Sequence, residues 1–182
     1  MNDTLKSIAK RFSCRSFTDQ MPSDEDLRAI ADAAIAAPSG MNRQAWRVIV
    51  VKNRELIDEM EAAGMAMLDG EASARIQARG GTLYYHAPCM IMVPIATEGK
   101  SMGLIDCGIL CENIAIAAAS LGLGSLICGM AGMPFGGEKG DYFKEKLGFP
   151  EGYEFGIAVL LGYAETETAP HEPDASKINF IE

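Results

Sequence analysis

Apolar residues recur every three to four positions along much of the chain, which is the spacing of one face of an α-helix. The clearest stretch begins after Ser23, whose hydroxyl is a typical helix cap and which three acidic residues follow, where the helix dipole favours negative charge. Pro38 disfavours the helical conformation at Ala37, so this helix is expected to end there. The pattern predicts helices over residues 3–11, 24–37, 54–67, 104–121 and 141–147.

Short apolar runs rich in β-branched residues lie between these helices. They predict buried strands over residues 46–51, 89–95, 125–128 and 155–161. Residues 69–85 are rich in Gly and Ala and are expected to form a mobile flap, residues 130–140 a Gly-rich loop, and the tail from Glu165 an extended polar segment. Few strands with this much helix favour an α+β fold or a three-layer sandwich over an all-parallel, doubly wound sheet.

The composition is that of an ordinary soluble globular protein, because 48% of the 182 residues are apolar and 23% are charged. This length suits one domain spanning residues 1–182 and suffices to bury a hydrophobic core. Five Cys are too few, and odd in number, for a disulfide-stapled scaffold. The net charge of −9 and the pI near 4.8 argue against general binding of nucleic acid or anionic membranes. A phosphate-bearing ligand would therefore need a local cluster of basic residues.

The pattern predicts neither an export signal nor a membrane span. The first residues, MNDTLKSIAKRF, contain no apolar core of signal-peptide length. The longest apolar stretch, residues 102–123, is interrupted by Asp106, Glu112 and Asn113, which are costly in lipid, so it is interpreted as a buried helix. Free Cys and eleven Met fit a reducing cytoplasm, which is the expected location.

The sequence KRFSCRSF at residues 10–17 places two guanidinium groups and two hydroxyl groups near the end of the first helix. Arg binds phosphate through paired hydrogen bonds, and Ser donates to phosphate or sugar oxygens. In so acidic a chain the cluster indicates an anion site around Arg11, Ser13 and Arg15; the alternative is a solvated basic turn that pairs with nearby acids. The same cations would favour the thiolate of Cys14 and lower its pKa.

A second motif, APSGMNRQAW at residues 37–46, lies between a predicted helix and a predicted strand. Pro38 stops the helix, and Gly40 permits unusual backbone angles. The short side chains of Ser39, Asn42 and Gln44 offer hydroxyl and amide groups, which suit the edge of a planar heterocycle because that edge presents both donors and acceptors. The alternative is an ordinary loop with an Asx turn.

Together, R-x-S-x-R-x-F and A-P-S-G-x-N-x-Q-x-W resemble the nitroreductase family of flavin enzymes. Later segments (RVIVV, DCGILCENIAIAAASLGLGS and GIAVLLGY) also sit where that family has counterparts, whereas residues 67–85 and the tail match poorly. The resemblance implies a homodimeric α+β fold, built as a three-layer sandwich with a mostly antiparallel central sheet flanked by helices. It also implies FMN bound at the subunit interface and NADH or NADPH as the electron donor.

The resemblance assigns roles to individual residues. Arg11 and Ser13 occupy the positions that, in the family, bind the phosphate and the ribityl chain. Arg15 occupies the position of a basic residue that lies near the N1–C2=O edge of the flavin. A fixed cation there stabilises the negative charge of the reduced flavin. Cys128 and Gly129 lie where backbone N–H groups approach N5 and O4 of the ring, and a backbone donor requires no particular side chain.

Other parts of the implied pocket come from the partner subunit and from the tail. Lys177 resembles a tail residue that reaches the phosphate, although HEPDASKINF lacks the second basic residue often found nearby. Ala45 replaces the Pro often seen before the Trp, and no residue of 71–85 is assigned to the pocket wall. The segment that the other subunit contributes matches Pro38, Ser39, Gly40, Asn42 and Gln44.

These residues predict an FMN-dependent NAD(P)H oxidoreductase with a ping-pong mechanism, in which hydride passes through flavin N5 to an electron-poor acceptor of the nitroaromatic or quinone type. No side chain is predicted to act as a general acid or base. The alternatives are a flavin-binding or sensing protein without dedicated turnover, and a specialised enzyme of the same fold such as a dehalogenase or an azoline dehydrogenase. Cys107 and Cys111 are interpreted as packed thiols and not as metal ligands, because a closed zinc site needs four ligands.

Overall fold

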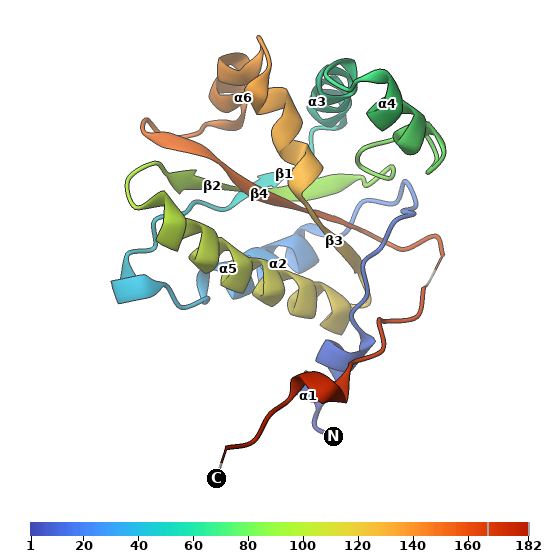
Figure 1. Cartoon of the computed structure of the whole chain (residues 1–182), viewed down its shortest axis with the longest axis vertical. Helices are drawn as coiled ribbons and strands as arrows, with labels where there is room; N and C mark the ends of the chain where they lie inside the picture. The colour runs from blue at the N-terminus through green and yellow to red at the C-terminus, as the bar shows by residue number, and fades with distance from the viewer. Residues whose placement is uncertain (167, 182) are drawn as a thin grey trace.

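The two longest strands form the centre of an antiparallel sheet. β2 (Cys89–Ala96) pairs with β4 (Tyr153–Gly162), and the shorter β1 (Ile49–Val51) and β3 (Gly124–Cys128) complete the order β1-β2-β4-β3. The computed structural model describes residues 1–166 and 168–181. Helices cover both faces of the sheet (Figure 1), which confirms the predicted three-layer α+β sandwich.

Within the described residues, six α-helices surround the sheet. Side chains cap the first turns of the first four: for example, Ser23 accepts a hydrogen bond from the Asp26 backbone N–H, and Asn53 accepts one from that of Leu56. The α-helices are α1 (Asp3–Lys10), α2 (Asp24–Ile35), α3 (Arg54–Ala66), α4 (Gly70–Gln77), α5 (Lys100–Ser120) and α6 (Gly140–Leu147). Three short 3-10 helices are η1 (Gly40–Asn42), η2 (Gly129–Gly136) and η3 (Ala175–Lys177).

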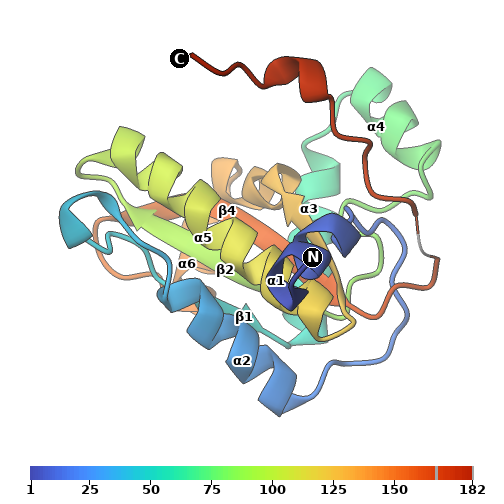
Figure 2. The same cartoon turned by 90° about the horizontal axis from the view of Figure 1, so that it is seen from below.

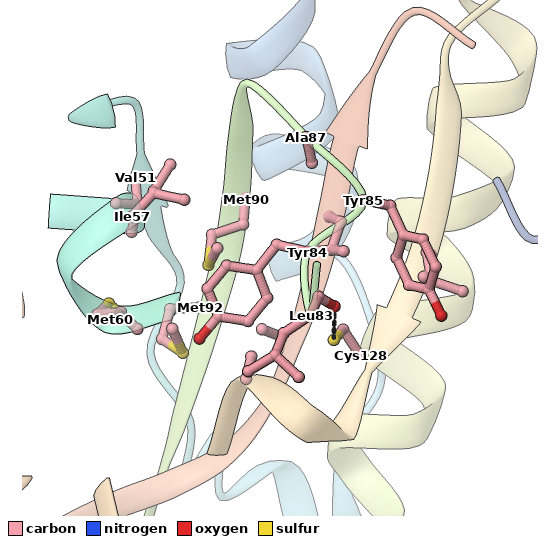
Figure 3. Close-up of a cluster of buried hydrophobic side chains, with 14 of the residues drawn as sticks. Val51, Ile57, Met60, Leu83, Tyr84, Tyr85, Ala87, Met90, Met92 and Cys128 are labelled. Carbon is pink, nitrogen blue, oxygen red and sulfur yellow. Dashed lines mark hydrogen bonds between the residues drawn. The ribbon is translucent and has the colours of Figure 1, made fainter. Parts of the chain in front are cut away.

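Successive side chains of the central strands enter two different hydrophobic cores. Met90 and Met92 of β2 belong to the core that the sheet shares with α3, α4 and α6 (Figure 3). Their neighbours Ile91 and Val93 belong to the core shared with α2 and α5. β2 is thus buried on both faces, which explains why its sequence is a continuous apolar run without alternating polar residues.

The central helix α5 is apolar on nearly all sides. Leu110 and Ile114 are fully buried, whereas Leu104, Ile105 and Ile109 are exposed on the opposite side. Among the described residues α5 is the one helix that is long and apolar enough to cross a membrane by length and composition alone. In the structure it packs along the sheet (Figure 2), and among the described residues the outward-facing Leu104, Ile105 and Ile109 stay exposed.

Residues 69–85, which are predicted to form a mobile flap and show no clear periodicity, contain a helix in their first half. Residues Gly70–Gln77 form α4, which Asp69 caps by accepting a hydrogen bond from the Ala72 N–H at 2.8 Å. Ile76 is buried against the core. The abundance of Gly and Ala hides this helix in the sequence, because one buried apolar residue gives no recognisable period.

The strand predicted over residues 46–51 pairs regularly only from Ile49 onward. Trp46 forms an isolated bridge with Ile95, and the Arg47 N–H donates to the Pro94 carbonyl at 3.0 Å. Pro94 has no N–H with which to continue the ladder, so the pairing is interrupted opposite it. The predicted helix over 104–121 also begins earlier than expected, at Lys100.

Glu61 of α3 fixes the loop that leads into β2. Its Oε1 accepts hydrogen bonds from the backbone N–H groups of Leu83 and Tyr84, at 2.5 and 2.9 Å, and from the hydroxyl of Thr82. The Leu83 carbonyl in turn accepts a weak hydrogen bond from Cys128 Sγ at 3.9 Å (Figure 3). Glu61 therefore ties this loop to α3, and the Cys128 contact ties it to the end of β3.

Candidate functional site

The segment after α1 runs beside the edge of the sheet. Ser13 forms a parallel bridge with Ser125 of β3, and the Cys14 N–H donates to the Ser125 carbonyl at 2.9 Å. Phe17 forms an antiparallel bridge with Ala164, just after β4. Backbone pairing thus fixes the predicted basic cluster at the β3 edge, within one segment of extended chain.

A polar pocket of about 270 Å³ opens at this cluster. The Arg11 guanidinium is mostly buried, and its Nε lies 3.8 Å from Glu112 Oε1 on α5. Arg15 is exposed and donates from Nη1 to the Ser13 carbonyl at 3.3 Å. The structure therefore brings together the three residues that the first motif predicts. The pocket is lined by Arg11, Phe12, Ser13, Arg15, Thr168, Ala169 and His171.

Cys14 differs from the expectation for a thiol among cations. It is fully buried, and its Sγ donates to the Ser16 carbonyl at 3.2 Å. Burial raises the pKa of this thiol, and that effect outweighs the opposing influence of the Ser16 contact and of the Arg15 charge. The predicted lowering of the pKa is therefore wrong, because the sequence shows the charges but not the burial.

Cys128 and Gly129 lie where β3 passes into η2. Cys128 is buried, and burial raises the pKa of its thiol, so the side chain is part of the core. Gly129 is exposed, and nothing lies within 4 Å of the position that a Cβ on it would take. A flat ligand can therefore approach the backbone at Gly129 closely.

The tail residue that the sequence indicates lies outside the pocket. The side chain of Lys177 is 81% exposed, and its Nζ lies 3.9 Å from Asp174 Oδ2 within η3. His171 lines the pocket instead. Sequence reasoning missed His171, because no spacing relates this residue to the arginines and only the path of the tail brings it near them.

The second motif forms an exposed loop with unusual backbone angles. Met41, Asn42 and Gln44 have φ values of 53°, 54° and 46°, in the left-handed region that non-glycine residues seldom adopt. The Gln44 N–H donates to Ser39 Oγ at 2.9 Å, and Gln44 Nε2 donates to Asn42 Oδ1 at 2.8 Å. Strain of this kind in an exposed loop is typical of binding sites.

Asp106 anchors this loop to α5. Its carboxylate is buried, and Oδ1 accepts a hydrogen bond from the Gly40 N–H at 3.0 Å. Asp106 is thus the acidic interruption that the sequence shows in a buried helix, and its function is to hold the backbone of the loop.

Within one chain the loop and the basic cluster lie toward opposite ends of α5. Gly40 contacts Asp106 near the start of the helix, whereas the Arg11 guanidinium faces Glu112 at 3.8 Å and Arg11 also lines a pocket with Ala119 near the helix end. At 1.5 Å per residue, roughly 9 Å of helix separates Asp106 from Glu112 and roughly 20 Å separates it from Ala119. Figure 2 shows α1 and η1 at these two ends. Among the described residues, no hydrogen bond or ion pair joins the two motifs within one chain.

The thiols of α5 are part of the core. Cys107 and Cys111 are buried, and burial raises the pKa of each to about 12. In the part of the chain that the structure describes, no three His, Cys, Asp or Glu side chains are grouped so as to hold a metal ion.

Known proteins are similar to this chain in sequence and in fold. The model of the nitroreductase family matches residues 8–163, which include both motifs and all four strands. The chain belongs to the nitroreductase family. The resemblance inferred from the two motifs is therefore confirmed.

Solved nitroreductases agree with this fold in detail. A nitroreductase of Desulfitobacterium hafniense with bound FMN is 58% identical, with a TM-score of 0.96 and complete coverage of both chains. A nitroreductase of Bacteroides fragilis with bound FMN is 27% identical, with a TM-score of 0.87 and complete coverage of both. A protein of Archaeoglobus fulgidus, provisionally named NADH dehydrogenase/NAD(P)H nitroreductase, is 35% identical over 96% of this chain and 92% of its own.

Proposed function

We propose that this nitroreductase-family chain is an FMN-dependent NAD(P)H oxidoreductase, with residues 1–182 acting as one FMN-binding unit. The observation that carries this proposal is the pocket that unites Arg11, Ser13 and Arg15 in an acidic protein. The similar structures with bound FMN support it. So do the names of relatives such as the NADPH-flavin oxidoreductase of Vibrio harveyi, which is 28% identical over 95% of this chain.

The residues present fit a flavin phosphate. Two guanidinium groups and a serine hydroxyl supply charge-assisted and neutral donors at one pocket. Arg11 and Ser13 would hold the phosphate and ribityl oxygens, and Arg15 would offset negative charge on the reduced ring. The open backbone at Gly129 would receive the ring edge. When bound, FMN supplies the hydride transfer between a nicotinamide and an electron-poor acceptor of the nitroaromatic or quinone type.

We further propose that the site is completed by a second copy of the chain. The loop and Arg11 contact α5 at different places and share no hydrogen bond or ion pair among the described residues, which favours a second chain as the source of the loop at each flavin. The outward side of α5 supplies an apolar surface: Leu104 is 46% exposed, Ile105 57%, and Ile127 on β3 47%. Nothing lies within 4 Å of a Cβ placed on Gly108, so two helices can approach closely there. Such a surface fits a twofold interface.

Mixing two defective variants tests the shared site. Arg11→Ala should disable one half of the site and Asn42→Ala the other half. A dimer with one chain of each kind would contain one intact site, so unfolding and refolding an equal mixture should restore about a quarter of the FMN sites. Each variant refolded alone is the control. If the mixture retains no more FMN than the two variants alone, each chain builds its own site and the shared-site proposal is wrong.

Turnover distinguishes an enzyme from a flavin-binding protein. We expect the FMN-loaded protein to oxidise NADH or NADPH steadily when a nitroaromatic or quinone is present. A ping-pong scheme predicts parallel lines when reciprocal rates are plotted against reciprocal donor concentration at several acceptor concentrations. Intersecting lines would refute the ping-pong scheme but not the oxidoreductase activity. Retention of FMN without reduction by either nucleotide would refute the enzyme and favour a flavin-binding or sensing protein.

A further inference from the structure

Gly129 combines a backbone donor with wide conformational freedom. It is the first residue of η2, so its N–H has no acceptor inside that helix. It is exposed, and nothing lies within 4 Å of the position that a Cβ on it would take. A glycine in such a place can turn its peptide group easily. A ligand that accepts a hydrogen bond from this N–H therefore depends on neighbouring groups that hold the peptide in one direction.

The thiol of Cys128 contacts the backbone around this glycine. Cys128 is buried, and its Sγ donates to the Leu83 carbonyl at 3.9 Å (Figure 3). The backbone N–H groups of Met130 and Ala131 also face this sulfur, and they partly offset the rise in the pKa of Cys128 that burial causes. One side chain thus links the end of β3 to the first turn of η2, with Gly129 between them.

The acceptor of this thiol is itself held by two residues of α3, one helical turn apart. Glu61 Oε1 accepts a hydrogen bond from the Leu83 N–H at 2.5 Å. At Gly64 the helix backbone lies directly against Leu83, whose Cδ1 is 2.9 Å from the position that a Cβ on Gly64 would take. Leu83 is fully buried. A continuous series of contacts therefore runs from Glu61 through Leu83 to Cys128.

We propose that Glu61 and Cys128 are positioning residues, which act through the backbone to hold the Gly129 N–H toward N5 of the flavin ring. This inference rests on the proposed FMN site. N5 of oxidised flavin accepts a hydrogen bond, whereas N5 of reduced flavin carries a hydrogen atom. A donor held at N5 therefore favours the oxidised flavin, and a donor that is less well held should raise the midpoint potential of the bound flavin.

The midpoint potential of the FMN-loaded protein tests the proposal. Cys128→Val fills the space of the thiol without a hydrogen bond, and Cys128→Ser keeps a donor. Cys128→Val should weaken binding of oxidised relative to reduced FMN roughly three- to tenfold, which raises the two-electron potential by about 15–30 mV. Cys128→Ser should stay within about twofold of wild type, or about 10 mV. Cys89→Val is the matched control, because it removes a buried thiol that donates to the Leu161 carbonyl at 3.4 Å in the other core.

Glu61→Ala tests whether the effect passes along the series of contacts. It should raise the potential in the same direction as Cys128→Val but by less, roughly two- to threefold in relative affinity, because the thiol remains. The double variant should shift no further than Cys128→Val alone, since residues that act through one shared contact do not add.

Amide hydrogen exchange of the flavin-free protein gives a readout that needs no flavin. The amides of Met130 and Ala131, which face the sulfur, should exchange roughly three- to tenfold faster in Cys128→Val, because an ordinary hydrogen bond is lost. They should exchange at the wild-type rate in Cys128→Ser and Cys89→Val.

Four outcomes would overturn all or part of the proposal. A wild-type potential in Cys128→Val, or an equal shift in Cys89→Val, would show that the thiol has no positioning function. An unshifted Glu61→Ala protein would overturn the part assigned to Glu61, and additive shifts in the double variant would refute the common path. Failure of the wild-type protein to bind FMN would refute the FMN site itself, and the exchange rates of the flavin-free variants would still show whether the thiol fixes η2.

Discussion

Replacing Asp106 with Ala tests whether the anchored loop contributes to flavin binding. The substitution removes the one carboxylate that accepts from the Gly40 N–H, at 3.0 Å, and leaves that donor without its partner. It changes neither the basic cluster nor the side chains of the loop. Any change in flavin affinity would therefore come from the position of the loop.

The size of the effect follows from comparing the anchor with the strain. A hydrogen bond to a charged acceptor contributes about 1.5–3 kcal/mol. Each non-glycine residue in the left-handed region costs roughly 1–2 kcal/mol, and the loop contains Met41, Asn42 and Gln44 there. Three such residues cost roughly 3–6 kcal/mol in total, which exceeds the contribution of the anchor, so the loop should relax when the anchor is lost. A loss of about 2 kcal/mol would reduce the binding-competent population about 30-fold and weaken flavin affinity by a similar factor.

Titration of flavin fluorescence gives the affinities, and urea unfolding confirms that the variant is folded. FMN and riboflavin should weaken in parallel, because the loop is expected to contact the ring and not the phosphate. Asp106→Asn keeps an acceptor oxygen at the same place and should bind both flavins within about threefold of wild type. Wild-type affinity of a folded Asp106→Ala protein for both flavins would refute the reasoning.

Arg11→Ala should raise the Kd for FMN roughly 10- to 150-fold and leave that for riboflavin unchanged, since the lost contact is charge-assisted; equal losses for both flavins would contradict this role. Glu61→Ala should lower the free energy of unfolding by about 1.5–3 kcal/mol, and Glu61→Gln by less, as urea titrations can show. Burial raises the pKa of Cys89, Cys107 and Cys111 to about 12, so the unfolded chain loses these protons first as the pH rises. In reducing buffer the free energy of unfolding should therefore fall above about pH 9, by up to ~1.4 kcal/mol per pH unit for each thiol, and Cys111→Ala should lessen the slope. A flat profile to pH 11 would contradict the assigned burial.

Elements with strong local signals were predictable from the sequence. α2 combines a capping Ser23 with a clear apolar period, and the structure begins that helix at Asp24. α4 was missed because its capping Asp69 precedes a stretch with one buried apolar residue. The shortening of β1 depends on Pro94, which lies opposite it in a strand some forty residues away, and such a tertiary effect is invisible to a local pattern.

The residues of the candidate site also differ in whether the sequence alone could predict them. Arg11, Ser13 and Arg15 are close in sequence, so their spacing sufficed to predict that they act together. His171 joins them only through the pairing of the tail with residues 16–18, which the sequence does not reveal. Burial of Cys14 likewise depends on the β3 edge and reverses a pKa expectation drawn from neighbouring charges.

The placement of the two motifs toward opposite ends of α5 has a consequence for handling the protein. Under the proposed shared site, a lone protomer possesses two half-sites and no whole one. Dilution that dissociates the dimer would then release FMN and remove the yellow colour of the protein. Excess FMN would favour dimerisation by mass action. The ratio of bound flavin to polypeptide would serve as a gauge of assembly.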